Sequence, residues 1–299
     1  MHARPETAGA RGPSSPSAPR PADPGRERFR RWLVAVERLP ALPDIAAGSL
    51  ALLDRDDCKL ADLAAYLAAD QAITAGLLRL ANSAFYAPVR ISDLTHAVTR
   101  LGFARVRDLV VGLSVWSSFG SDATRRNALW IHSALVAGAA KTLAQRTGRD
   151  DGEAFTGAVV HDVGKLLLGL RVGDPYWALM DASDGRESDL VAAEVREFGC
   201  HHGTVGGSLF EVWRLPPALV EVVRHHHDPL LPGQRLDSRT IVRIADRLVE
   251  ATDPATRTLD EEAFREVDRV APGLVNRERW PATWARIARE QQVISAIFL

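Results

Sequence analysis

Residues 158–165 read Ala-Val-Val-His-Asp-Val-Gly-Lys, and this stretch carries the strongest signal in the sequence. An apolar run with helical spacing ends in an adjacent histidine and aspartate, His161 and Asp162. The residues three and four positions from His161, which share its side of a helix, are Gly157, Ala158, Gly164 and Lys165. The small ones leave room for another helix or an ion to approach closely.

The same helical spacing continues on both sides of this stretch, since apolar residues recur three and four positions apart. The pattern predicts helices over residues 44–54, 60–69, 71–81, 94–101, 103–118, 125–147, 152–169, 188–198, 202–213, 217–227 and 237–251, with further helices within 261–299. Asp93 is placed to cap one of them and Gly102 to end it. Residues 171–187 have a loop-like composition with room for one short helix. Alternating strand patterns with hairpin turns are absent, so we predict an all-α fold.

The chain divides by composition into a tail, a helical domain and an extension. Residues 1–28 hold six prolines and no apolar periodicity, which is typical of a disordered tail. The domain is expected over 29–250, as an N-terminal lobe (29–120) and a second lobe (121–250) that meet near the polar run 120–124. The extension, 251–299, is expected to pack back onto the domain or onto a partner.

Composition excludes several functional classes. The chain has 299 residues, a net charge of −1 and no apolar run long enough to span a membrane. The near-neutral charge and the lack of a DNA-binding motif argue against a nucleic-acid binder. Two cysteines far apart, Cys58 and Cys200, suit a reducing cytoplasm and do not provide a thiolate zinc cluster.

Histidine is unevenly distributed, because seven of the nine histidines lie between His132 and His227. His132 lies on an apolar helical stripe with Leu129, Leu135 and Val136. Asp246 shares its helical face with Val242 and Val249, and a buried carboxylate requires a cation, a donor or an altered pKa.

A metal centre would account for these residues together, because neutral imidazoles and carboxylates bind zinc, iron and manganese. One ion would be held by His132, His161, Asp162 and Asp246. A second ion would be held by His202, His226 and His227, with Asp162 as a bridge. Lys165, one turn after His161, would contact a phosphate, and a two-metal site of this kind can hydrolyse phosphoesters.

Each residue also has an ordinary structural interpretation. A lone histidine on a helix face is usually hydrogen-bonded rather than a ligand. The triplet 225–227 would then cap a helix C-terminus. Asp246 would pair with Arg243 or Arg247, and Lys165 would be solvated.

Several further stretches share an order with one known family: Leu-Pro-Ala-Leu-Pro (39–43), Asp-Gln-Ala-Ile-Thr-Ala-Gly-Leu-Leu-Arg-Leu-Ala-Asn-Ser-Ala (70–84), Ala-Val-Thr-Arg-Leu-Gly (97–102), Trp-Ile-His-Ser (130–133), the 159–165 stretch, 202–206, Trp-Arg-Leu-Pro (213–216) and His-His-Asp-Pro (226–229). With Asp246, this order resembles the HD superfamily of metal-dependent phosphohydrolases. More narrowly, it resembles the HDOD domain, the HD-related output domain of bacterial signalling proteins. The resemblance covers about residues 33–250, and the Asn82-Ser83 block is specific to HDOD. Gln71 replaces a proline that is frequent in the family.

The resemblance implies an all-α fold with an N-terminal helical lobe against an HD-like lobe. HDOD domains are mostly regarded as regulatory modules, often with eroded metal ligands. Here the ligands match those of the HD-GYP relatives that cleave cyclic di-GMP: His132, His161, Asp162, His202, His226, His227 and Asp246. The Gly-Tyr-Pro stretch of those relatives is missing, since Asp228-Pro229-Leu230 follows the histidines.

Two functions therefore follow as expectations. The first is a cytoplasmic regulatory protein with one or two divalent ions (Fe, Mn or Zn), a signalling protein partner and a nucleotide ligand. The second is an active phosphohydrolase on a nucleotide or cyclic dinucleotide, in which Asp162 and Lys165 take part in catalysis.

Overall fold

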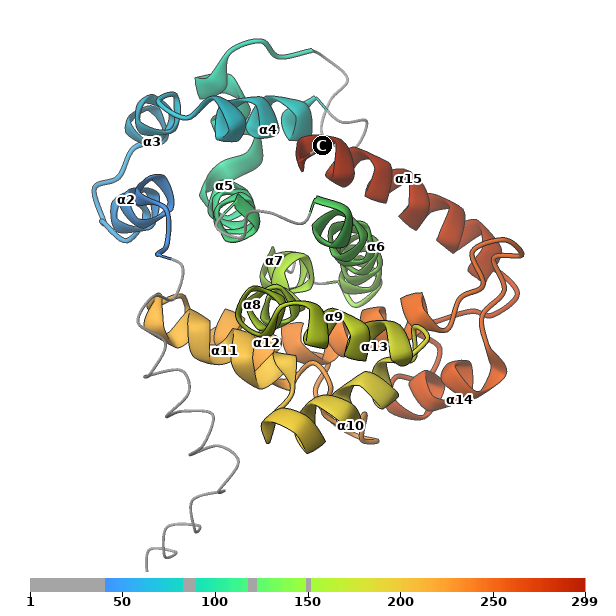
Figure 1. Ribbon diagram of the computed structural model, residues 1–299. Coiled ribbons are helices and arrows are strands. Elements are labelled where there is room, and N and C mark those ends of the chain that lie inside the picture. Colours follow the sequence, from blue (N-terminus) through green and yellow to red (C-terminus); the bar gives the residue numbers. More distant parts are fainter. Residues whose placement is uncertain (1–40, 83–89, 118–122, 149–151, 299) are drawn as a thin grey trace, which may run out of the picture.

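The computed structural model describes residues 41–82, 90–117, 123–148 and 152–298 (Figure 1). The expected disordered tail over 1–28 and most of the expected seam at 120–124 lie outside these residues. The described chain is helical, without strands apart from one isolated bridge between Thr252 and Leu259, so the predicted all-α fold is confirmed. None of its helices combines the length and the apolar composition needed to cross a bilayer.

The first helices are α2 (Asp44–Leu53), α3 (Leu60–Leu67), α4 (Gln71–Ala81) and α5 (Leu94–Ser117). α5 consists of two helical segments joined at Gly102, whose positive φ of 76° breaks the helix there, as the sequence predicts. The Asp93 carboxylate accepts a hydrogen bond from the backbone N–H of His96 at 2.8 Å and so caps the first segment.

Asn82 directly follows α4, and its side chain forms hydrogen bonds with two separate parts of the backbone. Its amide nitrogen donates to the carbonyl oxygens of Leu78 and Ile91, at 2.8 and 2.7 Å. Its amide oxygen accepts from the backbone N–H of Ile91 at 2.6 Å. This residue therefore joins the end of α4 to the segment that leads into α5.

The remaining helices build the larger part of the molecule. They are α6 (Ala123–Arg146), α7 (Gly152–Val160), α8 (Val163–Val172), α9 (Asp174–Ala182), α10 (Glu187–Phe198), α11 (His202–Val212), α12 (Pro217–His225), α13 (Ser238–Glu250), α14 (Glu261–Val270) and α15 (Trp280–Phe298). Figure 1 shows α6, α7 and α8 in the middle of the molecule, with α11, α12 and α13 along one side.

The buried apolar side chains form two clusters. The first includes Leu63, Leu77 and Val110 and is built from residues of α2 to α5 that end at Val110. The second begins at Val111 and extends to Ile294 on α15. The two cores therefore meet within α5, while the expected domain boundaries at 120 and 250 stay predictions.

The C-terminal extension packs back onto the domain, which was one of the two arrangements expected. α15 lies along α6 in Figure 1, and its Trp284 and Ile287 are buried. A Cβ on Gly138 of α6 would stand 3.3 Å from the backbone oxygen of Ile287, so the two helices approach closely. Arg146 donates to the carbonyl oxygen of Leu274 at 3.0 Å and holds the preceding loop.

Two local expectations differ from the structure. The predicted helix over 152–169 is divided into α7 and α8, with His161 and Asp162 between them. The expected loop over 171–187 is largely helical, since α8 continues to Val172 and α9 follows. Gly173, with a φ of 72°, separates these two helices, and Pro175 lies in the first turn of α9.

Candidate metal centre

Five parts of the chain bring the seven predicted ligands to one place. His132 lies on α6, and His161 and Asp162 lie at the junction of α7 and α8. His202 is in the first turn of α11, His226 and His227 are at the end of α12, and Asp246 is on α13. They fall into two groups whose candidate ligand atoms lie within 4.8 Å of one another. One group is Asp162, His202, His226 and His227, and the other is His132, His161 and Asp246. The grouping differs from the expected one only in that Asp162 falls with the second set of histidines.

The break between α7 and α8 directs His161 into the site. Its Nδ1 lies 2.7 Å from the carbonyl oxygen of Ala158, to which it donates. That carbonyl would otherwise accept the backbone N–H of Asp162 in a continuing helix, so the imidazole competes with the helix at this point. Burial lowers the pKa of His161. A neutral ring that donates through Nδ1 presents the lone pair of Nε2 to the site.

The same arrangement recurs at the end of α12. His226 donates through Nδ1 to the carbonyl oxygen of Val223 at 2.7 Å. Burial and the neighbouring His227 hold the pKa of His226 well below its usual value. Nε2 of His226 is therefore also available as a ligand atom, and its direction is fixed by the backbone.

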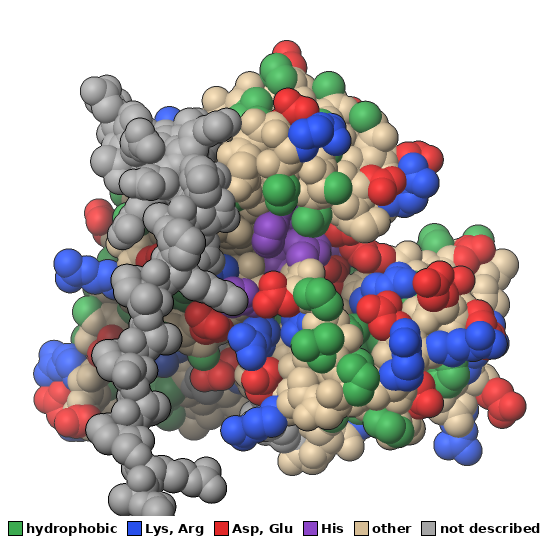
Figure 2. Space-filling view, turned by 90° about the horizontal axis from the view of Figure 1, so that it is seen from below, with side chains coloured by type: hydrophobic (Ala, Val, Ile, Leu, Met, Phe, Trp, Pro, Cys, Tyr) green, Lys and Arg blue, Asp and Glu red, His purple; other side chains and the backbone are tan. Residues whose placement is uncertain are grey.

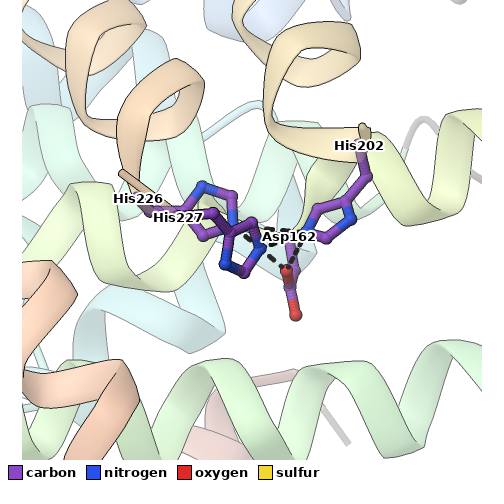
Figure 3. A group of neighbouring side chains, drawn as sticks. All are labelled: Asp162, His202, His226 and His227. Carbon is purple, nitrogen blue, oxygen red and sulfur yellow. Dashed lines mark hydrogen bonds and ion pairs between the residues drawn. The ribbon is translucent and has the colours of Figure 1, made fainter. Parts of the chain in front are cut away.

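Asp162 contacts residues of both groups, and Figure 3 shows it with His202, His226 and His227. Its Oδ1 is 3.3 Å from Nε2 of His202 and 3.7 Å from Nε2 of His226. Its Oδ2 is 3.5 Å from Nε2 of His161 and 3.7 Å from Nε2 of His132. Burial would raise the pKa of this carboxyl, but His161 and Lys165 outweigh it and hold the pKa well below the usual value. One ionised carboxylate thus faces both groups.

The second group is completed by Asp246. Its Oδ1 lies 3.1 Å from Nε2 of His132 and 3.7 Å from Nε2 of His161. Burial opposes the charged form of His132, yet the Asp246 carboxylate raises the pKa of His132 to about 9. His132 is also the more accessible histidine of this pair, with 27% of its side chain exposed.

Two buried polar atoms of the predicted ligands have no hydrogen-bond partner among the described residues. They are Nε2 of His161 and Oδ1 of Asp162. An unpartnered buried lone pair costs free energy, and a divalent cation bound between such atoms removes that cost. The donor set of imidazole nitrogens and carboxylate oxygens fits zinc, iron or manganese.

The ordinary interpretations of Asp246 and Lys165 are wrong. Arg243 donates to the carbonyl oxygens of Asp228 and Pro229, and Arg247 pairs with Glu266 at 2.9 Å, so neither arginine pairs with Asp246. Lys165 is buried, with only 4% of its side chain exposed.

The remaining histidines of the cluster stay outside both groups. His225 lies in the last turn of α12, as the capping interpretation expects, and its Nδ1 is 3.0 Å from Oδ2 of Asp228. His201 precedes α11 as its N-cap, and burial lowers its pKa to about 4.

Glu187 is a site residue that sequence reasoning missed. Its carboxylate accepts from Lys165 Nζ at 2.8 Å, and its Oε1 lies 3.4 Å from Nε2 of His202 and 3.5 Å from Nε2 of His227. Lys165 also donates to Oδ2 of Asp162 at 2.9 Å. Glu187 is the last residue of the segment 171–187 that was expected to be a loop, and an acid in the first turn of a helix is an ordinary feature, so no sequence signal singled it out.

Glu194 is a second missed residue, and it orients His202 from behind. It is fully buried and accepts from both the backbone N–H and Nδ1 of His202, at 2.9 and 2.8 Å. Its other oxygen accepts from the Tyr176 hydroxyl at 2.7 Å. Burial opposes the charged form of His202, but Glu194 raises the pKa of His202 to about 10. This contact directs Nε2 of His202 toward Asp162.

The centre opens to solvent through a cavity of about 650 Å³. Figure 2 shows histidine side chains at the bottom of a hollow, with acidic side chains beside them. The cavity reaches His132, Asp162, Lys165 and Glu187. Its walls carry further acids, Asp181, Asp184 and Glu250. A molecule of nucleotide size therefore has a path to the candidate ligands.

The comparisons with known proteins agree with this fold. The family model of the HDOD domain matches residues 39–229, more than half of the chain. A curated relative from Treponema pallidum (strain Nichols), named "Uncharacterized protein", is 23% identical over 225 residues. That match takes in 74% of this chain but only 44% of the relative, so this chain spans less than half of the relative's length.

Two solved structures share the architecture. One is from Shewanella amazonensis SB2B and is named "Putative phosphohydrolase"; it has a TM-score of 0.70 and 23% identity, and the match covers 89% of this chain and 97% of that one. The other is an HDOD domain protein with unknown function from Geobacter sulfurreducens, with a TM-score of 0.69, 24% identity and coverage of 91% and 98%. At these identities the likeness shows the fold.

Proposed function

The chain belongs to the HDOD domain family, and we propose that it is a signal-transduction protein whose second lobe holds a divalent metal centre. The domain would span 29–250. The proposed ligands are His132, His161 and Asp246 for one ion, His202, His226 and His227 for a second ion, and Asp162 between them. Iron, manganese and zinc all suit this donor set. The two cysteines are free, which agrees with a cytoplasmic location.

The observation that carries this proposal is the position of Asp162. Its two oxygens face different sets of imidazole nitrogens, at 3.3 and 3.7 Å on one side and 3.5 and 3.7 Å on the other. A structural core does not require such an arrangement, because a single ion pair would satisfy a buried carboxylate. A bridge between two cations uses both oxygens at once.

Regulation through this centre would work by ligand binding. A nucleotide that enters the cavity would contact the ions and the surrounding side chains, and the resulting change of surface would be recognised by a protein partner. The HDOD domain as a family is regarded as a regulatory module, which supports this role.

A second candidate function, phosphohydrolase activity, is favoured by the cavity that reaches the proposed ligands. A bound pair of divalent ions supplies a nucleophilic hydroxide and stabilises the leaving oxygen. In this function Asp162 would hold both ions in register, and Lys165 would supply a positive charge beside the phosphate of a nucleotide or cyclic dinucleotide. The Gly-Tyr-Pro stretch of the relatives that cleave cyclic di-GMP is missing from this chain, which argues against cyclic di-GMP as the substrate.

Elemental analysis of protein purified without chelator tests the metal centre. We expect stoichiometric iron, manganese or zinc in the wild type and its loss in the Asp162→Ala variant. Glu250→Ala is the matched control, since Glu250 lines the same cavity outside both ligand groups, and this variant should keep its metal. Wild-type protein without stoichiometric metal, even after reconstitution, would contradict the proposal.

A hydrolysis screen of the metal-loaded protein separates the two functions. The panel should contain nucleoside mono- and triphosphates and linear and cyclic dinucleotides. Turnover on the order of 1 per second, lost in Asp162→Ala, would establish the enzyme. Binding of a nucleotide without turnover would support the regulatory protein.

A further inference from the structure

Glu187 is the acidic residue in the centre that neither ligand group contains. Building on the proposed metal centre, we propose that Glu187 is an additional protein ligand of the ion held by His202 and His227. We further propose that an entering phosphate competes with Glu187 for this ion and for Lys165. The centre would then carry its own internal anion, which a ligand must displace.

The position of Glu187 supports a ligand role. Oε1 of Glu187 lies 3.4 Å from Nε2 of His202 and 3.5 Å from Nε2 of His227. These two imidazole nitrogens are themselves only 2.7 Å apart, so all three atoms converge on one point. The Glu187 side chain is 16% exposed, and Oε1 has no hydrogen-bond partner that meets normal geometry among the described residues. A carboxylate oxygen is a common ligand beside imidazoles on iron, manganese and zinc.

Other acids around the same cavity lack these contacts. Asp181 pairs with Arg125, with its Oδ2 at 2.6 Å from the guanidinium. Asp184 and Glu250 are exposed, and within the described residues neither forms an ion pair with a histidine. The convergence on His202 and His227 therefore belongs to Glu187 specifically and is not a general property of an acidic cavity.

The chain positions Glu187 through a tight turn. Between α9 and α10, Asp184 and Gly185 both have positive φ, 49° and 72°. The turn is closed by the backbone N–H of Arg186, which donates to the carbonyl oxygen of Ser183 at 2.9 Å. Two consecutive left-handed residues reverse the chain and place the first residue of α10 over the centre. Glu187 is thus held at the N-terminal end of α10 by a turn that itself lines the cavity.

Competition with phosphate follows from the two contacts that Glu187 makes. It contacts the imidazoles of the proposed ion site and accepts from Lys165 at 2.8 Å. A phosphoryl group that binds the ion and Lys165 would need both of these positions, because it is also an anion with several acceptor oxygens. Glu187 and the phosphate would therefore exclude each other.

The test compares Glu187→Gln with Asp184→Asn, which removes a negative charge from the same cavity without removing a contact to histidine. Two affinities are measured for each protein: manganese by competition with a chromophoric chelator, and inorganic phosphate by calorimetry on the manganese-loaded protein. For Glu187→Gln we expect manganese affinity to fall by about tenfold or more, as for a lost ligand-shell contact. We expect phosphate affinity to rise by about tenfold if Glu187 occupies the site about nine-tenths of the time.

Removal of any nearby negative charge lowers the affinity for a cation and raises that for an anion, so the size of both changes relative to the control variant distinguishes this role from simple charge removal. Asp184→Asn should leave manganese affinity nearly unchanged and raise phosphate affinity much less. Unchanged manganese affinity in Glu187→Gln would overturn the ligand role. Equal gains in phosphate affinity in the two variants would overturn the competition. The proposed function fails separately, if the wild type itself binds no metal.

Spectroscopy distinguishes the loss of a metal ligand from misfolding of the variant. Cobalt-loaded wild type and Glu187→Gln should differ in visible absorption, because the coordination of the ion changes, while their far-ultraviolet circular dichroism stays the same. Identical cobalt spectra in two equally folded proteins would also overturn the ligand role.

Discussion

Gly164 of α8 packs directly against the backbone of His202 on α11. A Cβ atom on Gly164 would clash with the carbonyl oxygen of His202 and would stand 2.7 Å from its carbonyl carbon. It would also lie 3.0 Å from the backbone nitrogen of Gly206. The small residues around His161 therefore do what the sequence predicts, since they let a second helix approach. This approach brings His202 to Asp162, which directly precedes α8.

Gly164→Ala should destabilise the protein and weaken metal binding. Helix propensity alone predicts the opposite sign, because alanine stabilises a helix interior by about 1 kcal/mol relative to glycine. The clash with His202 involves backbone atoms that cannot rotate away, and overpacking of this kind costs about 1–3 kcal/mol. Urea unfolding with and without metal measures the balance.

Leu170→Ala is the control for Gly164→Ala, because Leu170 lies on the same helix and is 47% exposed. It should change the unfolding free energy by no more than about 0.5 kcal/mol. A Gly164→Ala variant that is more stable than the wild type would mean that α8 and α11 are not in contact at this point.

The helices and the proposed ligands could be predicted from the sequence because both predictions depend on local patterns. Apolar spacing places His132 and Asp246 on core-facing stripes, where a polar side chain needs a partner. Asp93 and Gly102 carry the start and stop signals of the first segment of α5, and both act as predicted. The residue types, together with the helix faces on which the apolar spacing places them, indicate metal chemistry.

The rest depends on contacts between distant segments. The apolar pattern continues from Val160 through Val163 into α8, so periodicity does not show the break at which His161 turns inward. Glu187 and Glu194 lie on a helix with many polar residues, and nothing local distinguishes an acid that faces the centre from one that faces water. Only the packing of α10 against the centre makes that distinction.

Glu194→Gln should reduce the affinity for metal although Glu194 is not itself a proposed ligand. Glu194 accepts from Nδ1 of His202 at 2.8 Å and so fixes the direction of Nε2. Loss of such a contact typically lowers metal affinity by about 10–100-fold. Chelator competition measures the change, and unchanged affinity would contradict the orienting role.

Tyr176→Phe is the matched control, since the Tyr176 hydroxyl donates to the other oxygen of Glu194 and does not contact His202. We expect a much smaller effect on metal affinity, because the bond between Glu194 and His202 stays intact. An effect as large as that of Glu194→Gln would assign the loss to general disruption of this buried network.

Lys165→Met should destabilise the metal-free protein more than the metal-loaded protein. The ammonium group neutralises two buried carboxylates, those of Asp162 and Glu187, at 2.9 and 2.8 Å. Removing one partner of a buried ion pair costs about 3–5 kcal/mol when nothing replaces the charge. Bound divalent ions would replace it.

Urea unfolding of chelator-treated and manganese-saturated protein measures this difference. Lys59→Met, at an exposed position before α3, should change the unfolding free energy by no more than about 0.5 kcal/mol in either state. An equal cost of Lys165→Met in both states would show that no cation takes over the role of Lys165.

Metal affinity should rise with pH above neutrality. Although burial opposes the charged forms, Asp246 raises the pKa of His132 to about 9, and Glu194 raises the pKa of His202 to about 10. In the metal-free protein both imidazoles therefore hold an extra proton at pH 7. An ion needs the lone pair on Nε2, so its binding releases these protons and becomes more favourable as their concentration falls. Each released proton contributes up to about tenfold in affinity per pH unit.

Calorimetric titration with manganese in buffers of different ionisation enthalpy counts the released protons directly. His201→Gln supplies the control, because burial lowers the pKa of His201 to about 4 and its ring is already neutral at pH 7. This variant should release as many protons as the wild type, although the substituted residue is adjacent to His202. Manganese binding that releases no protons, or that weakens between neutral pH and about pH 9, would contradict ligation by His132 and His202.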